Sequence, residues 1–145
     1  MNHESRLIIY TDGGSRGNPG PSAIGAVVGD PSTSSGRVKY YSEKIENTTN
    51  NVAEYKAIVF ALKKAKHLLG GKKAEETEIE LRSDSELIVS QLNGNYKIKE
   101  DGLKPFFIDV WNLKQDFKSV SFKLIPREKN KEADKLVNQT LDTLL

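Results

Sequence analysis

Four acidic residues lie in or beside segments rich in apolar residues: Asp12, Glu54, Asp84 and Asp134. Carboxylate oxygens are the ligands that Mg²⁺ prefers, together with water and phosphate oxygens. Two such ions roughly 3.5 to 4 Å apart can activate a water on one side of a phosphodiester and stabilise the leaving oxygen on the other. That reaction needs no nucleophilic side chain, and the chain has no cysteine.

Asp12 and Glu54 occupy the more informative positions. Asp12 closes the apolar run RLIIYTD, where an unpaired carboxylate costs several kcal/mol unless a cation or hydrogen-bond donors compensate it. The alternative is an aspartate that caps the following glycine loop. Glu54 lies within about 40° of Ile58 and Ala61 on a helical wheel, so it shares the apolar face. Attraction to the positive end of the helix dipole would explain why a glutamate lies in the first turn, but not why it lies on the apolar face.

Asp84 and Asp134 have stronger structural alternatives. Asp84 stands between a strand-like run and a helix, so it could be a helix N-cap, with Ser83 or Ser85 competing for that role. Asp134 lies at the edge of the apolar stripe of the last helix, where a charged residue is usually just solvated. Asp84 and Asp134 taken singly are thus weak candidates, and metal binding is predicted from all four carboxylates together.

A mixed sheet and its helices must bring these residues together. Apolar and β-branched runs predict strands over residues 6–12, 23–29, 38–45, 77–83 and 121–126. Helical spacing and start signals predict helices over 52–69, 85–92, 105–116 and 130–145, with a hairpin loop at 30–36 and a charged linker after 70–71. Crossover helices make the later strands parallel to the first, so their carboxyl ends meet at one edge, where ligands gather.

The composition fits one soluble globular domain: the chain has 145 residues, of which 37% are apolar and 29% charged. The lack of cysteine excludes disulfides and zinc-thiolate sites and favours a cytoplasmic protein. No run approaches the roughly 20 apolar residues that span a bilayer, and the N-terminus has no cleavage-signal pattern, so we expect no membrane contact. The net charge of +2 does not by itself identify a nucleic-acid binder.

Four segments spread over nearly the whole chain carry the acidic residues. They read TDGGSRGNPGP at 11–21, NNVAEYKA at 50–57, SDSELIVSQL at 83–92 and REKNKEADKLVN at 127–138. In this order and spacing they resemble the catalytic segments of the ribonuclease H type 1 family. The resemblance implies an α/β, ribonuclease H-like fold over a single domain, 1–145, whose five-stranded mixed sheet has the order 3-2-1-4-5 and is flanked by helices.

The resemblance also implies a function and a set of roles. The function is an endoribonuclease that hydrolyses the RNA strand of RNA/DNA hybrids with two Mg²⁺ or Mn²⁺ ions and leaves 5′-phosphate and 3′-hydroxyl ends. The four carboxylates match the metal ligands, and the substrate contacts would be Gly13, Gly14, Asn18, Asn50, Asn51 and Ser85. In the family, the residues that match Asn50 and Asn51 contact the minor groove, where 2′-hydroxyls distinguish RNA from DNA. Either asparagine could instead cap the helix.

The loop before the last helix departs from the family pattern. Many members carry a histidine there, whereas this loop reads IPREKNKEAD and neither His3 nor His67 is near it. We assign Arg127 to the catalytic set as the substitute. An arginine can hold a phosphate bidentately, but it cannot act as a general acid near neutral pH. The alternative is an arginine paired with Glu128 or Glu132.

The stretch from Gln91 to Pro105 is the second departure. Some members carry a basic helical protrusion here that grips the DNA strand, and this stretch is too short for it. We therefore expect this chain to bind hybrids more weakly than members that carry the protrusion, because it neutralises fewer phosphates.

Two other functions compete. The glycine-containing turn after the first strand is also found in actin-like ATPases and sugar kinases, but those proteins duplicate the domain, and the sequence has no Walker pattern. A non-catalytic module that binds hybrid or double-stranded RNA is disfavoured, because four carboxylates without metal would repel phosphates. We expect a monomer, with double-stranded RNA as a second substrate to test.

Overall fold

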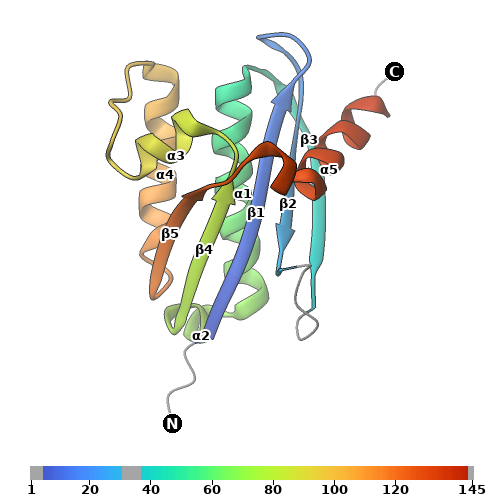
Figure 1. The fold of residues 1–145 in the computed structure, drawn as a ribbon. Helices are drawn as coiled ribbons and strands as arrows, with labels where there is room; N and C mark the ends of the chain where they lie inside the picture. Colours follow the sequence, from blue (N-terminus) through green and yellow to red (C-terminus); the bar gives the residue numbers. More distant parts are fainter. Residues whose placement is uncertain (1–4, 31–36, 144–145) are drawn as a thin grey trace.

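A five-stranded mixed sheet forms the centre of the molecule, which a computed structural model describes over residues 5–30 and 37–143 (Figure 1). The strands are β1 (Ser5–Ser15), β2 (Gly20–Val28), β3 (Lys39–Thr48), β4 (Thr77–Ser83) and β5 (Ser119–Leu124). Their order in the sheet is β3-β2-β1-β4-β5, which confirms the predicted order. β1, β2 and β3 pair antiparallel, whereas β4 and β5 run parallel to β1.

Helices cover the two faces of the sheet unequally. The helices are α1 (Asn50–Leu69), α2 (Gly71–Glu75), α3 (Glu86–Leu92), α4 (Lys104–Lys114) and α5 (Lys131–Asp142), with 3-10 turns at Asp101–Leu103 and Arg127–Lys129. Figure 1 shows α1 and α4 behind the sheet and α5 in front of it, over β1 to β3. Much of the front of β4 and β5 is therefore left without a covering helix.

The main core lies between the sheet and α1. It includes Ile9 of β1, Ile79 and Leu81 of β4, and Ile58 and Leu62 of α1, all nearly or completely buried. Burial of each such side chain contributes about 1.5 to 3 kcal/mol. A smaller apolar cluster fixes α5 to the opposite face of the sheet; its members are Ala23, Val137 and Leu141. Apolar packing thus fixes α1 on one face of the sheet and α5 on the other.

β1 is longer than predicted, because it continues past Asp12 to Ser15. Its pairing with β4 ends at Tyr10, but its pairing with β2 runs on to Ser15. Gly13 permits this extension beside α1, since a Cβ there would lie 2.2 Å from the carbonyl oxygen of Ala53. Asp12 therefore lies inside β1, just beyond the end of the parallel pairing.

Other boundaries differ by a few residues. α1 begins at Asn50 and ends at Leu69, and Gly70 caps it with a φ of 80° that glycine adopts without strain. The predicted charged linker is the short helix α2. The last helix begins at Lys131 after a 3-10 turn, while residues 31–36 of the predicted hairpin loop and residues 144–145 of the predicted last helix lie outside the described residues.

Two expectations concern helices. Within residues 5–30 and 37–143, no helix is both long and apolar enough to cross a membrane. Residues 93–100 contain no helix, so the segment between α3 and the 3-10 turn at Asp101–Leu103 carries no helical protrusion.

Candidate metal-dependent active site

Three carboxylates from three separate elements meet at one edge of the sheet. Asp12 comes from β1, Glu54 from the second turn of α1, and Asp84 directly follows β4. Each offers an oxygen, and these three oxygens lie within 4.8 Å of one another. They line a cleft of about 350 Å³. The topology explains the meeting, because β1 and β4 are parallel neighbours whose carboxyl ends reach the same edge.

Asp134 stands beside this group of three. It lies in the first turn of α5 and lines the same cleft, but its carboxylate is not among the three oxygens within 4.8 Å of one another. Its charge is close enough to contribute to raising the pKa of Asp12. The structure therefore places all four predicted carboxylates at one cleft, three in contact range of one ion and the fourth at its side.

A backbone amide orients Glu54. The N–H of Gly13 donates to Glu54 Oε1 at 2.6 Å, so the strand that carries Asp12 also holds the glutamate. The sequence left open whether Asp12 caps the glycine loop; the first amide of that loop goes to Glu54 instead.

The electrostatics of the cluster are those of crowded, buried anions. Burial, followed by the charges of Asp84 and Asp134, raises the pKa of Asp12 from 3.8 to about 7. Burial, followed by the charge of Asp12, raises the pKa of Glu54 well above its usual 4.5, and the Gly13 amide only partly opposes this. The ionised cluster is therefore costly on its own, and a bound cation would relieve that cost.

Neither Asp84 nor the two asparagines cap the helices beside them. Ser85 is the N-cap of α3 and accepts from the amide of Ile88. Thr49 is the N-cap of α1 and accepts from the amide of Val52. Asp84 is thus released from the capping role that the sequence allowed, and its carboxylate faces the cleft.

The predicted substrate residues gather around the same cleft, with one exception. Its lining includes Gly13, Gly14, Asn50, Asn51 and Ser85. Asn18 does not line it; its Oδ1 accepts from the amide of Asn50, and Asn50 Oδ1 accepts from the amide of Ser15. Asn18 and Asn50 therefore tie the glycine loop to the start of α1.

Arg127 lines the cleft from the 3-10 turn before α5. The alternative of a pairing with Glu128 or Glu132 finds no support, because no ion pair joins these three described residues. His67 lies near the far end of α1, among Lys66, Gly70 and Asp116. His3 falls outside the described residues.

Sequence reasoning missed several polar residues of the site. Ser15, Arg16 and Asn138 also line the cleft. Asn138 lies one helical turn after Asp134, so the i, i+4 rule could have found it. Asn130, one turn before Asp134, is buried and donates to Asp84.

The residues present fit a divalent cation. All the candidate ligands are oxygens, which suits Mg²⁺ or Mn²⁺, and the cleft leaves space for waters and for a phosphate. The crowding of acidic groups, expressed in the raised pKa of Asp12, is the physical sign of a site built for added positive charge.

The sheet order and the carboxylate cluster together define a ribonuclease H-like domain with a group of carboxylates that could hold a metal ion. The Reverse transcriptase-like family matches residues 10–140. Ribonuclease HI of Halobacterium salinarum is 37% identical to this chain; the match covers 94% of this chain and 65% of the length of that protein. LC11-RNase H1, solved in complex with an RNA/DNA hybrid, is 46% identical with a TM-score of 0.86, over 95% of this chain and 98% of that one. The chain belongs to the ribonuclease H type 1 family.

Some relatives are much longer. The bifunctional protein of Mycobacterium tuberculosis is 37% identical over 94% of this chain, which spans only 36% of that protein's length.

Proposed function

We propose that this chain is an endoribonuclease that hydrolyses the RNA strand of RNA/DNA hybrids. The observation that carries the proposal is the meeting of Asp12, Glu54 and Asp84, with oxygens within 4.8 Å, in a cleft lined by amide and basic side chains. The family membership and the hybrid bound by LC11-RNase H1 support it. Cytoplasmic location and a monomeric state are part of the same proposal.

The chemistry is the attack of a water oxygen on phosphorus. The new P–O bond forms as the bond to the 3′-oxygen breaks, and the 3′-oxygen receives a proton, which leaves 5′-phosphate and 3′-hydroxyl ends. Asp12, Glu54, Asp84 and Asp134 would hold two Mg²⁺ or Mn²⁺ ions. When bound, these ions supply activation of the water and stabilisation of the leaving oxygen.

The remaining residues of the cleft bind and orient the substrate. Arg127 can hold a phosphate through two parallel hydrogen bonds. The amides of Asn50 and Asn51 can reach 2′-hydroxyls in a wide minor groove, which selects RNA for the strand to be cut. The Gly13 amide keeps Glu54 directed at the cluster during these steps.

Cleavage of labelled nucleic acids tests the proposal. The substrates are an RNA/DNA hybrid, single-stranded RNA, double-stranded RNA and double-stranded DNA, each with Mg²⁺ or Mn²⁺. The proteins are wild type, Asp12→Asn and, as a matched control, Asp109→Asn, which removes an exposed carboxylate on α4. We expect hybrid cleavage by wild type and Asp109→Asn and none by Asp12→Asn. Cleavage of double-stranded RNA would add a second substrate.

Chelation separates the enzyme from a non-catalytic binding module. With EDTA, cleavage should stop while hybrid binding persists. Hybrid binding without cleavage under every metal condition would refute the proposal and favour the binding module.

A further inference from the structure

Asn130 is a buried asparagine outside the lining of the carboxylate cleft. It lies between the 3-10 turn at Arg127–Lys129 and α5, and its exposed fraction is 1%. Its side-chain Nδ2 donates to the carbonyl oxygen of Thr11 at 2.9 Å and to Asp84 Oδ2 at 3.3 Å. Its backbone carbonyl oxygen accepts from the backbone amide of Asp134 at 3.1 Å. One residue thus contacts Asp84, Asp134 and the residue before Asp12.

The two donor contacts determine which way the amide faces. A flipped amide would turn Oδ1 towards a carbonyl and a carboxylate, both of which are acceptors. In the observed orientation Oδ1 is buried and has no hydrogen-bond partner among the described residues. An unpaired buried acceptor costs about 1 to 3 kcal/mol. The fold therefore keeps the donors of Asn130 on Thr11 and Asp84 although its acceptor is left unpaired.

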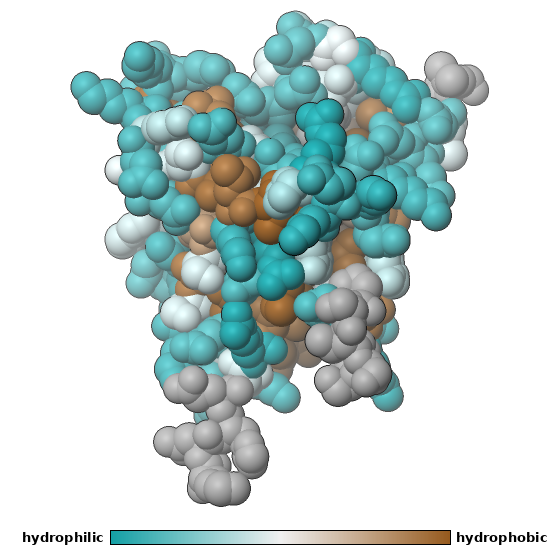
Figure 2. Space-filling view, viewed as in Figure 1, coloured by the Kyte–Doolittle hydropathy of each residue, from teal (hydrophilic) through white to brown (hydrophobic). Residues whose placement is uncertain are grey.

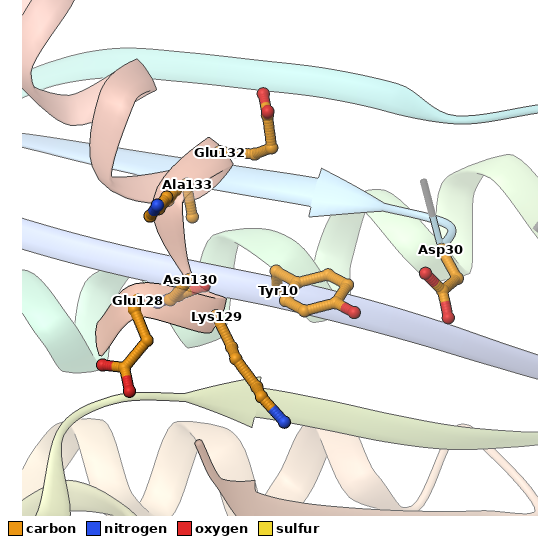
Figure 3. Close-up of a pocket in the computed structure, with 8 residues that line it drawn as sticks. Tyr10, Asp30, Glu128, Lys129, Asn130, Glu132 and Ala133 are labelled. Carbon is orange, nitrogen blue, oxygen red and sulfur yellow. The ribbon is translucent and has the colours of Figure 1, made fainter. Parts of the chain in front are cut away.

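Asn130 also lies at the edge of a second cavity. Figure 3 shows Asn130 beside Tyr10, Lys129 and Ala133 around a cavity of about 200 Å³. Asn130 thus borders this cavity and also contacts Asp84, which lines the carboxylate cleft. Its two donor hydrogen bonds, to the Thr11 carbonyl and to Asp84, are the polar contacts that direct the amide at Asp84.

We propose that Asn130 is a positioning residue that orients the Asp84 carboxylate for metal binding; this rests on the proposed function. A donor on one carboxylate oxygen limits rotation of the group and leaves its other lone pairs for a cation. Groups that hydrogen-bond to metal ligands in this way typically matter by about 10- to 100-fold in metal affinity or activity.

A purely structural role is the alternative. In that case Asn130 would only fix the start of α5 to β1 through the carbonyl of Thr11. Its removal would then lower stability but leave the metal affinity of the folded protein unchanged. Metal affinity therefore distinguishes the two roles.

Mn²⁺ binding, followed by the electron paramagnetic resonance signal of the free ion, is the primary measurement. Asn130→Ala is compared with Asn93→Ala, whose Nδ2 donates to the carbonyl oxygen of Phe122 at 3.1 Å, away from the carboxylates. We expect Asn130→Ala to weaken Mn²⁺ binding about 10-fold or more, and Asn93→Ala to leave it within about two-fold of wild type. In an Asp84→Asn background, Asn130→Ala should cause no further loss.

The kinetic readout follows from the same reasoning. With hybrid substrate at low Mn²⁺, Asn130→Ala should lower kcat with little change in KM, and high Mn²⁺ should restore much of the loss. Unchanged Mn²⁺ affinity, or a loss equally large in the Asp84→Asn background, would overturn the inference. Lack of hybrid cleavage by wild type would instead overturn the proposed function, whereas Mn²⁺ affinity would still test Asn130.

A measurement without any change at Asn130 guards against misfolding of the variant. In wild type, addition of Mg²⁺ should shift the side-chain amide resonances of Asn130 but not those of Asn93 in nitrogen-15 correlation spectra. The shift should disappear in Asp84→Asn. If the Asn130 resonances do not respond to Mg²⁺ in wild type, or still respond in Asp84→Asn, Asn130 does not act through Asp84.

Discussion

Asp12→Asn should stabilise the metal-free protein while abolishing its cleavage activity. The folded state raises the pKa of Asp12 from 3.8 to about 7, first through burial and then through the charges of Asp84 and Asp134. The folded protein therefore binds this proton more tightly than the unfolded chain does. Between these two pKa values stability falls as pH rises, because the unfolded state binds fewer protons there. Asparagine has the same shape and carries no such penalty.

The magnitude follows from the shift. The pKa of Asp12 rises by about 3, which at 1.36 kcal/mol per pH unit costs the folded state about 4 kcal/mol of stability. This full penalty applies above pH 7, where Asp12 is ionised in both the folded and the unfolded state. At pH 5 only about one unit separates the pH from 3.8, so the penalty shrinks to about 2 kcal/mol. The variant should thus exceed wild type by up to about 4 kcal/mol at pH 8, and by less as pH falls.

Urea denaturation followed by circular dichroism measures the effect. Wild type, Asp12→Asn and the control Asp109→Asn are unfolded at pH 5 to 8, first in EDTA and then in excess Mg²⁺. The control should stay within about 0.5 kcal/mol of wild type. Mg²⁺ should stabilise wild type more than Asp12→Asn, because the ion binds the folded ligands.

Two results would contradict this reasoning. One is an Asp12→Asn protein that is no more stable than wild type at pH 8 in EDTA. The other is a stability difference that stays constant between pH 8 and pH 5, since a penalty from ionisation must depend on pH.

Three further predictions concern other residues. Gly13→Ala should lower the free energy of unfolding by about 3 kcal/mol or more, because its Cβ would lie 2.2 Å from the Ala53 carbonyl oxygen. Urea denaturation measures this loss, with Gly102→Ala as the control, since a Cβ at Gly102 meets open space. A smaller loss of stability for Gly13→Ala than for Gly102→Ala would be evidence against this. Glu54→Gln should stop cleavage but retain hybrid binding, measured by fluorescence anisotropy; loss of both together would argue against a catalytic role. Arg127→Ala should weaken hybrid binding and reduce the slope of log affinity against log salt by about 1, and an unchanged slope would mean that Arg127 contacts no phosphate.

Much of this protein could be derived from its residues in order. The strand and helix runs and the change from antiparallel pairing to crossover connections follow from local patterns. The resemblance to the ribonuclease H type 1 family implied the strand order 3-2-1-4-5, which the structure confirms. The face of Glu54 was also readable, because helical periodicity places it on the apolar side. Local periodicity carries such information because neighbours along the chain determine which side of an element a residue occupies.

Tertiary contacts decided the rest. Thr49 caps α1 in place of the two asparagines, and Ser85 caps α3 in place of Asp84. Which residue caps a helix depends on where that helix begins in the folded protein. β1 runs past Asp12 because β2 continues to pair with it, and the sequence alone could not show that partner. Asn130 looked like an ordinary residue of a charged loop, yet it touches Thr11 and Asp84, 119 and 46 positions away.

Residue types and their order thus determined which groups are available and which elements carry them. The raised pKa of Asp12, the approach of three carboxylates and the hydrogen bonds of Asn130 exist only after folding. The physical reason is that burial and charge–charge interactions depend on distances through space, and residues far apart in the chain acquire those distances only when the sheet and its helices pack.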